Sequence, residues 1–102
     1  MRASDATVIN LVLERLAEFG WSLVGVDTGA CLQGAETSAE ALALVGGSHE
    51  AHIVLCRRMD GATGAILVTP GCGRPEETIA DYSAPLDAAI TTLSDALEAI
   101  EP

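Results

Sequence analysis

The segment TPGCGRPEETIADYS, residues 69–83, places a cysteine on a glycine-rich loop. A cysteine nucleophile needs a lowered thiol pKa and a base within reach, which is usually a histidine. His52 could supply that base for Cys72. No signature of a known cysteine enzyme surrounds Cys72, however. The sequence therefore predicts a turn with no catalytic residue, and a small thiol-dependent enzyme using Cys72 and His52 is the alternative.

Phosphate and metal sites are disfavoured by the spacing of the same residues. GCGRPE lacks the lysine and hydroxyl of a P-loop, and Glu76 replaces the third glycine of a dinucleotide-binding motif. His49 and His52 are three residues apart, whereas a zincin helix needs a spacing of four. The three cysteines form no CxxC pair. We therefore expect neither a metal nor a cofactor.

Charge is the strongest compositional signal. Fifteen acidic residues oppose five arginines, no lysine is present, and the formal net charge is −10. Direct binding to nucleic acid is not expected, because neutralising phosphates requires clustered cations. The acidic excess favours a protein partner with a basic surface, or serves solubility alone.

The acidic residues continue to the end of the chain without a basic residue. Seven acids and no base follow Arg74. Positions 87, 95 and 98 fall on one side of a predicted helix, where neighbours at such spacing lie about 5–6 Å apart, which resembles the phosphate spacing of a nucleic acid strand. We predict a non-enzymatic acidic interaction protein, and the alternative is a solvated surface. The predicted partner-binding residues are Glu76, Glu77, Asp87, Asp95 and Glu98.

Length and apolar runs define the broad class. A chain of 102 residues predicts a single domain, 1–102. No apolar run reaches the roughly 18–20 residues that span a bilayer. Asn10, Glu14 and Arg15 interrupt the first apolar run, unlike a secretory signal. We therefore expect a cytoplasmic protein with no membrane segment and with free thiols.

Three helices are predicted from apolar periodicity. The first covers residues 4–19, with Ser4 as its N-cap and Gly20 just beyond its end. The second covers residues 37–45 and opens with a T-x-x-E capping box. The third covers roughly residues 84–100, with Ser83 as its cap. Its apolar stripe consists of Leu86, Ile90, Leu93, Leu97 and Ile100.

Two hairpins are predicted between these helices. Residues 21–26 and 30–33 flank the turn residues Asp-Thr-Gly, and residues 50–58 and 63–70 flank Asp60-Gly61. Residues 78–83 could form a short extended piece that leads into the last helix.

The resulting order, α-β-β-α-β-β-α, predicts an α+β fold with a four-stranded antiparallel sheet and the helices on one face. An exposed edge strand could pair with a second copy of the chain, so a structural homodimeric module is a further alternative.

The C-terminal half of the chain resembles small uncharacterised accessory proteins of bacteriophages, plasmids and genomic islands. The family pattern is an apolar hairpin, a glycine- and asparagine-rich turn, a PxExIxDY[ST] stretch and a closing helix. Cys72 and Arg74 depart from it, which argues against a shared catalytic cysteine. The resemblance implies an accessory protein, for example an inhibitor that imitates nucleic acid charge, as some anti-CRISPR proteins do. The matching residues are Gly64, Ile66, Leu67, Val68, Gly71, Gly73, Pro75, Glu77, Ile79, Asp81, Tyr82 and Ser83.

Overall fold

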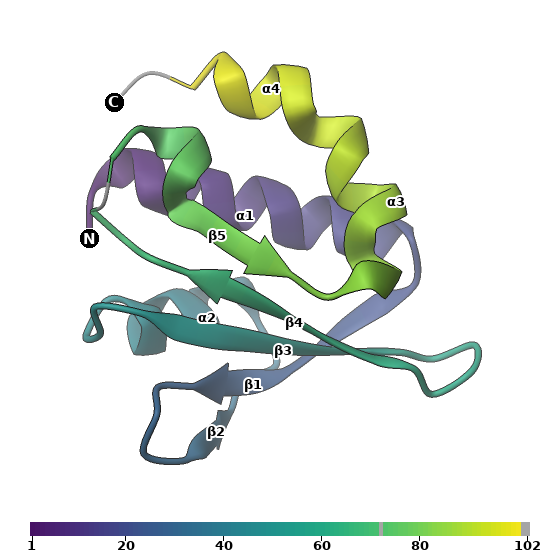
Figure 1. Ribbon diagram of the computed structural model, residues 1–102. Coiled ribbons are helices and arrows are strands. Elements are labelled where there is room, and N and C mark those ends of the chain that lie inside the picture. Colours follow the sequence, from purple (N-terminus) through teal and green to yellow (C-terminus); the bar gives the residue numbers. More distant parts are fainter. Residues whose placement is uncertain (72, 101–102) are drawn as a thin grey trace.

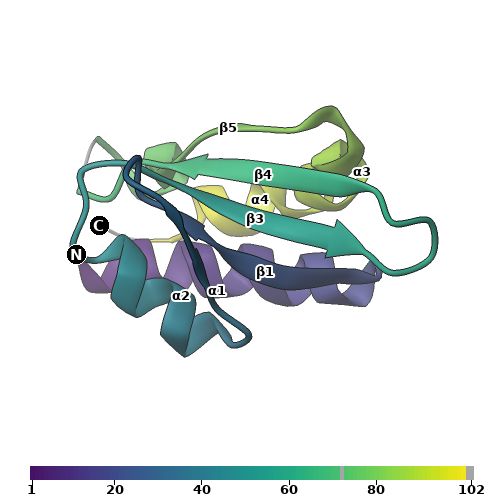
Figure 2. The same ribbon diagram turned by 90° about the horizontal axis from the view of Figure 1, so that it is seen from below.

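The computed structural model describes residues 1–71 and 73–100. A five-stranded antiparallel sheet in the order β2-β1-β3-β4-β5 carries the helices on one face (Figure 1, Figure 2). The predicted α+β class and antiparallel sheet are confirmed. The strands are β1 (Trp21–Asp27), β2 (Leu32–Gly34), β3 (Ala51–Arg57), β4 (Thr63–Val68) and β5 (Ile79–Tyr82). The helices are α1 (Ala3–Glu18), α2 (Ser38–Val45), α3 (Asp87–Ile90) and α4 (Ser94–Glu98), with the 3-10 turns η1 (Pro75–Thr78), η2 (Ala84–Leu86) and η3 (Thr91–Leu93).

Alternation along the central strand β3 separates the two faces of the sheet. Ala51, Ile53 and Leu55 are buried toward the helices, whereas the residues between them, including His52 and Val54, lie on the uncovered face. The buried stripe of α1 packs onto the covered face and completes the hydrophobic core. The covered face therefore holds the protein together, and the other face remains partly exposed.

The ends of α1 show why this helix starts where it does. The sequence predicts Ser4 as the N-cap, but the cap is Arg2, and Ser4 is buried within the first turn. The carboxylate of Asp5 accepts the backbone N–H of Arg2 at 3.0 Å, so a satisfied helix end forms two residues earlier. Gly20 follows the helix with a φ of 90°, as predicted for a C′ glycine.

The turn chemistry read from the sequence is confirmed at two places. Thr37 caps α2 by accepting the backbone N–H of Glu40 at 3.2 Å. The side chain of Asp27 accepts the N–H of Gly29 at 2.8 Å, and Gly29 adopts a φ of 101° that closes the first hairpin turn.

The second hairpin turn is closed by Asp60. Its carboxylate accepts the N–H of Ala62 at 3.1 Å and pairs with the Arg57 guanidinium at 2.7 Å. The hydrogen bond from Arg57 lowers the pKa of Asp60 to about 2. Arg57 in turn stacks over the Trp21 ring, 5.1 Å from its centroid. Arg57 therefore contacts Asp60 within its own hairpin and Trp21 on the neighbouring strand β1.

The predicted four-stranded sheet is one strand short. Residues 79–82 form β5, which pairs with the outer side of β4 and makes a fifth strand. Ser83 occupies the N-cap position of η2, as predicted, but its side chain makes no capping hydrogen bond there. Its hydroxyl accepts the N–H of Ala65 at 2.9 Å and its backbone N–H donates to the Ala65 carbonyl at 3.0 Å. Ser83 is thus used to fasten the end of β5 to β4.

The predicted helix over residues 84–100 is broken into η2, α3, η3 and α4, and the chain changes direction between α3 and α4 (Figure 1). Three hydroxyls in this stretch bond back to carbonyls of the preceding turn. Thr91 donates to the Asp87 carbonyl at 2.8 Å, Thr92 to that of Ala89 at 2.6 Å, and Ser94 to that of Thr91 at 3.1 Å. Such back-bonding competes with the helical ladder and bends helices.

Gly25 and Gly34 face each other across β1 and β2, and they form a matched pair for substitution. A Cβ on Gly25 would collide with the backbone carbonyl of Gln33, whereas a Cβ on Gly34 would meet nothing within 4 Å. We expect Gly25→Ala to lower the free energy of unfolding by about 1–3 kcal/mol through overpacking. Gly34→Ala should change it by less than about 0.5 kcal/mol. Urea unfolding of both variants measures the difference, and equal effects would contradict the close approach of β2.

Candidate functional site

The carboxylate of Asp5 organises the glycine loop that the sequence singled out. The Asp5 side chain is fully buried and accepts a hydrogen bond from the Arg2 guanidinium at 3.0 Å. It also accepts the N–H of Gly71 at 3.0 Å and the hydroxyl of Thr78 at 2.7 Å. Gly71 and Thr78 flank the loop, so one carboxylate joins both ends of the loop to the first turn of α1.

The electrostatics of this contact suit a structural role. Burial by itself raises the pKa of Asp5, but the hydrogen bonds from Arg2 and Thr78 favour the ionised form more strongly, and the pKa falls to about 2. A carboxylate with so low a pKa and with its oxygens already hydrogen-bonded is a poor general base at neutral pH. Asp5 is an anchor for the loop.

Further hydrogen bonds hold the described residues of the loop. The Arg2 guanidinium donates to the Gly73 carbonyl at 2.8 Å. Glu77, one of the predicted partner-binding residues, accepts the Arg74 N–H at 3.0 Å within its own turn. Glu77 is exposed but is used to close η1, whose first residue is Pro75. Cys72 lies outside the described residues, and for Glu76 the structure describes the backbone without the side chain.

His52, the base in the thiol-dependent alternative, lies on the uncovered face of the sheet. It is exposed in the middle of three strands, opposite Asp27 of β1 and Leu67 of β4. It lines a shallow hollow of about 300 Å³ together with Leu67, Asp81 and Tyr82. The pairing of His52 with Cys72 stays a prediction, because Cys72 is outside the described residues.

The remaining predicted partner-binding residues are exposed on the C-terminal segment. Asp87 accepts the Tyr82 hydroxyl at 2.8 Å, and this hydrogen bond raises the pKa of Tyr82. Asp95 and Glu98 are exposed on α4, whereas Leu97, which lies between them in the sequence, is buried. Because the helix is broken between α3 and α4, these acids do not share one straight helix side. Asp87 is a joint between β5 and α3, whereas Asp95 and Glu98 face solvent.

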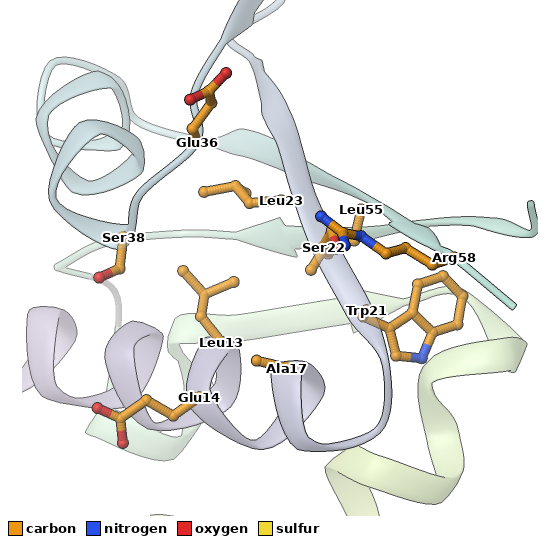
Figure 3. A pocket seen from close by; sticks show the side chains of 10 residues that line it. All are labelled: Leu13, Glu14, Ala17, Trp21, Ser22, Leu23, Glu36, Ser38, Leu55 and Arg58. Atoms are coloured by element: carbon orange, nitrogen blue, oxygen red, sulfur yellow. The ribbon is translucent and has the colours of Figure 1, made fainter.

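A larger groove lies where sequence reasoning identified no site. It has a volume of about 690 Å³ and opens between α1, the first half of β1 and the segment leading into α2. Glu14 and Glu36 stand at its two ends, with Leu13 and Leu23 between them, as Figure 3 shows. Arg58 lines it from the end of β3. These residues come from distant parts of the chain and share no motif, so no local signal could have found them.

Across residues 1–71 and 73–100, no three His, Cys, Asp or Glu side chains gather closely enough to hold a metal ion. In that part of the chain, no helix combines the length and apolar character needed to cross a bilayer.

Comparison with known proteins adds no relative: no protein-family model, no curated protein and no solved structure matches the chain. The function must therefore be inferred from the chain's own residues.

The Asp5 contact predicts a specific acid sensitivity. The pKa of Asp5 is 3.8 ordinarily and about 2 in the folded protein, so the unfolded chain binds the proton more readily. The stability from this group, about 2 kcal/mol, is fully present above roughly pH 4 and is lost as the pH falls through about 2. Asp5→Asn should remove this part of the pH dependence, as measured by urea unfolding between pH 2 and pH 7.

Asp60→Asn provides the comparison for that experiment. The pKa of Asp60 is also lowered to about 2, but its side chain is exposed and solvent weakens its pair with Arg57. The loss of stability at neutral pH should be smaller for Asp60→Asn than for Asp5→Asn. An equal loss in the two variants would show that burial of Asp5 adds nothing to its contribution to the free energy of unfolding.

Proposed function

We propose that this chain is a non-enzymatic acidic interaction protein that binds a protein partner with a basic surface. The observation that carries the proposal is the distribution of its few cations. Arg2, Arg15 and Arg57 form salt bridges with the acids Asp5, Glu18 and Asp60 three residues further along the chain. Three of the five arginines therefore neutralise near neighbours, and the acidic excess is left on the surface.

The C-terminal segment presents much of this excess. Asp95 and Glu98 are exposed on α4, and no basic residue follows Arg74 in the sequence. The helix dipole disfavours a negative charge in the last turn of a helix by a few tenths of a kcal/mol, so Glu98 is not placed there for stability. A basic partner surface would relieve that repulsion and gain electrostatic steering at the same time.

One concrete form of this function is a cytoplasmic accessory or inhibitor protein of a phage or mobile element. Such a protein would occupy a surface on which its partner otherwise binds nucleic acid. The acidic excess supports this form, because an anionic surface competes with phosphates for the same cations.

Neutralising two acids on α4 tests the proposal. Lysate of the native host is passed over the immobilised protein at low salt, and retained proteins are eluted by a salt gradient and identified. The double variant Asp95→Asn, Glu98→Gln should bind the purified partner roughly 2- to 30-fold more weakly, since exposed ion pairs contribute about 0.2–1 kcal/mol each. Affinity for the unmodified chain should fall as salt rises.

The control removes the same charge elsewhere. The control is the double variant Glu40→Gln, Glu50→Gln. Glu40 is exposed on α2 and Glu50 is exposed just before β3, and a glutamine at position 40 can still complete the capping box. This variant should retain the partner at almost the original affinity. Retention that is independent of salt, or equal losses in the two double variants, would contradict binding through the C-terminal acids.

A further inference from the structure

The first half of β1 has one side that no strand pairs with in the described part of the chain. β3 pairs with β1 from Trp21 onward, but β2 pairs only with Gly25, Val26 and Asp27. One more hydrogen bond, from the Ala35 N–H to the Val24 carbonyl at 3.2 Å, follows before the chain turns away toward α2. The stretch from Trp21 to Leu23 therefore has an open edge on the side of the groove.

Two backbone hydrogen bonds fix the direction of the groups on this edge. Arg58 donates its N–H to the Gly20 carbonyl at 3.4 Å, toward β1, and Arg57 donates to the Ala62 carbonyl at 2.8 Å, toward β4. The direction of the backbone N–H groups alternates along an antiparallel strand. The backbone N–H of Cys56 therefore also points toward β1, where Cys56 and Ser22 form a hydrogen-bonded pair. The N–H and C=O groups of Trp21 and Leu23 consequently point away from β3.

The groove at this edge is lined by both apolar and charged side chains. Its floor contains Leu13, which is 8 % exposed, and the half-buried Leu23. The exposed carboxylates of Glu14 and Glu36 stand at opposite ends of it (Figure 3). Arg58 adds one guanidinium, and the charged residues that line the groove therefore sum to one net negative charge, from two glutamates and one arginine.

We propose that an extended segment of the protein partner, with basic side chains in the majority, adds to the sheet as a strand along residues 21–23. Main-chain hydrogen bonds to Trp21 and Leu23 would hold the segment, which is the mode known as β-augmentation. Its apolar side chains would lie on Leu13 and Leu23, and its basic side chains would reach Glu14 and Glu36. This inference rests on the proposed function, because it assigns a second contact to the same kind of basic partner.

The size of the edge sets what can be bound. Three strand residues span about 10 Å, so the edge engages a segment of about three to five residues. A segment this short binds weakly by itself. It adds to the affinity of the whole partner because it is covalently linked to the surface that contacts α4.

A defined peptide tests the edge directly. The full-length ¹⁵N-labelled protein is titrated with an acetylated and amidated peptide of alternating lysine and valine, and amide shifts and hydrogen exchange are followed. The amides of Trp21 and Leu23 should shift, and their exchange should slow. The same peptide N-methylated at every residue, which lacks the backbone donors on both edges, should bind at least about fivefold more weakly. Equal binding of the two peptides would overturn strand addition.

Variants of the lining give the second readout. Glu14→Gln with Glu36→Gln should weaken the peptide roughly 2- to 30-fold, and Arg58→Gln should tighten it, because the groove then becomes more negative. Asp95→Asn with Glu98→Gln should leave peptide binding unchanged.

If that variant loses the partner while the Glu14 and Glu36 variant binds peptide normally, the proposed function stands and the groove does not take the segment. Slow exchange of Trp21 and Leu23 in a concentration-dependent dimer, without peptide, would assign the edge to a second copy and overturn the proposal.

Discussion

The buried carboxylate of Asp5 is the contact on which the C-terminal half of the structure depends. It holds the backbone of Gly71 and the hydroxyl of Thr78 against the first turn of α1. Between these two residues the chain leaves β4 and returns as β5, so the anchor fixes where the fifth strand begins. The fold thus uses an ion buried with hydrogen bonds on all sides, which is the condition under which a buried charge is tolerated.

The contacts of Asp5 also change how the role of the glycine-rich loop is interpreted. A cysteine between two glycines suggests an exposed nucleophile. In the described part of the loop, however, the side chains of Arg2, Asp5 and Glu77 hydrogen-bond to the backbone. Gly71 and Gly73 adopt φ values of 78° and 65°, in the left-handed region that favours glycine. These two glycines therefore serve the backbone conformation of the loop.

The short β2 strand connects the fold to the proposed interaction. Register shifts at Val24, where β1 bulges against β3, and Gly25 allows the backbone of Gln33 to approach closely. β2 then ends, and the connection to α2 leaves both a groove and an unpaired strand edge at Trp21 to Leu23. The acidic surface on α4 and the groove are both net negative. The reason lies in the composition, because three of the five arginines form salt bridges with acids three residues further along the chain. Both features favour a basic partner.

The sequence by itself determined the parts that depend on neighbours along the chain. Helical periodicity, the Thr37 cap and the turns at Gly29 and Gly61 follow from local hydrogen bonding and φ preferences, and the α+β class follows from their order. Only the tertiary structure decided the rest. Two partners of Asp5 lie 66 and 73 residues away along the chain. The Ser83 hydroxyl hydrogen-bonds to the backbone of β4 and not to the helical turn that follows it. The groove is lined by residues of α1, β1, the segment leading into α2 and the end of β3. Such contacts leave no local pattern, because their geometry exists only once the sheet has formed.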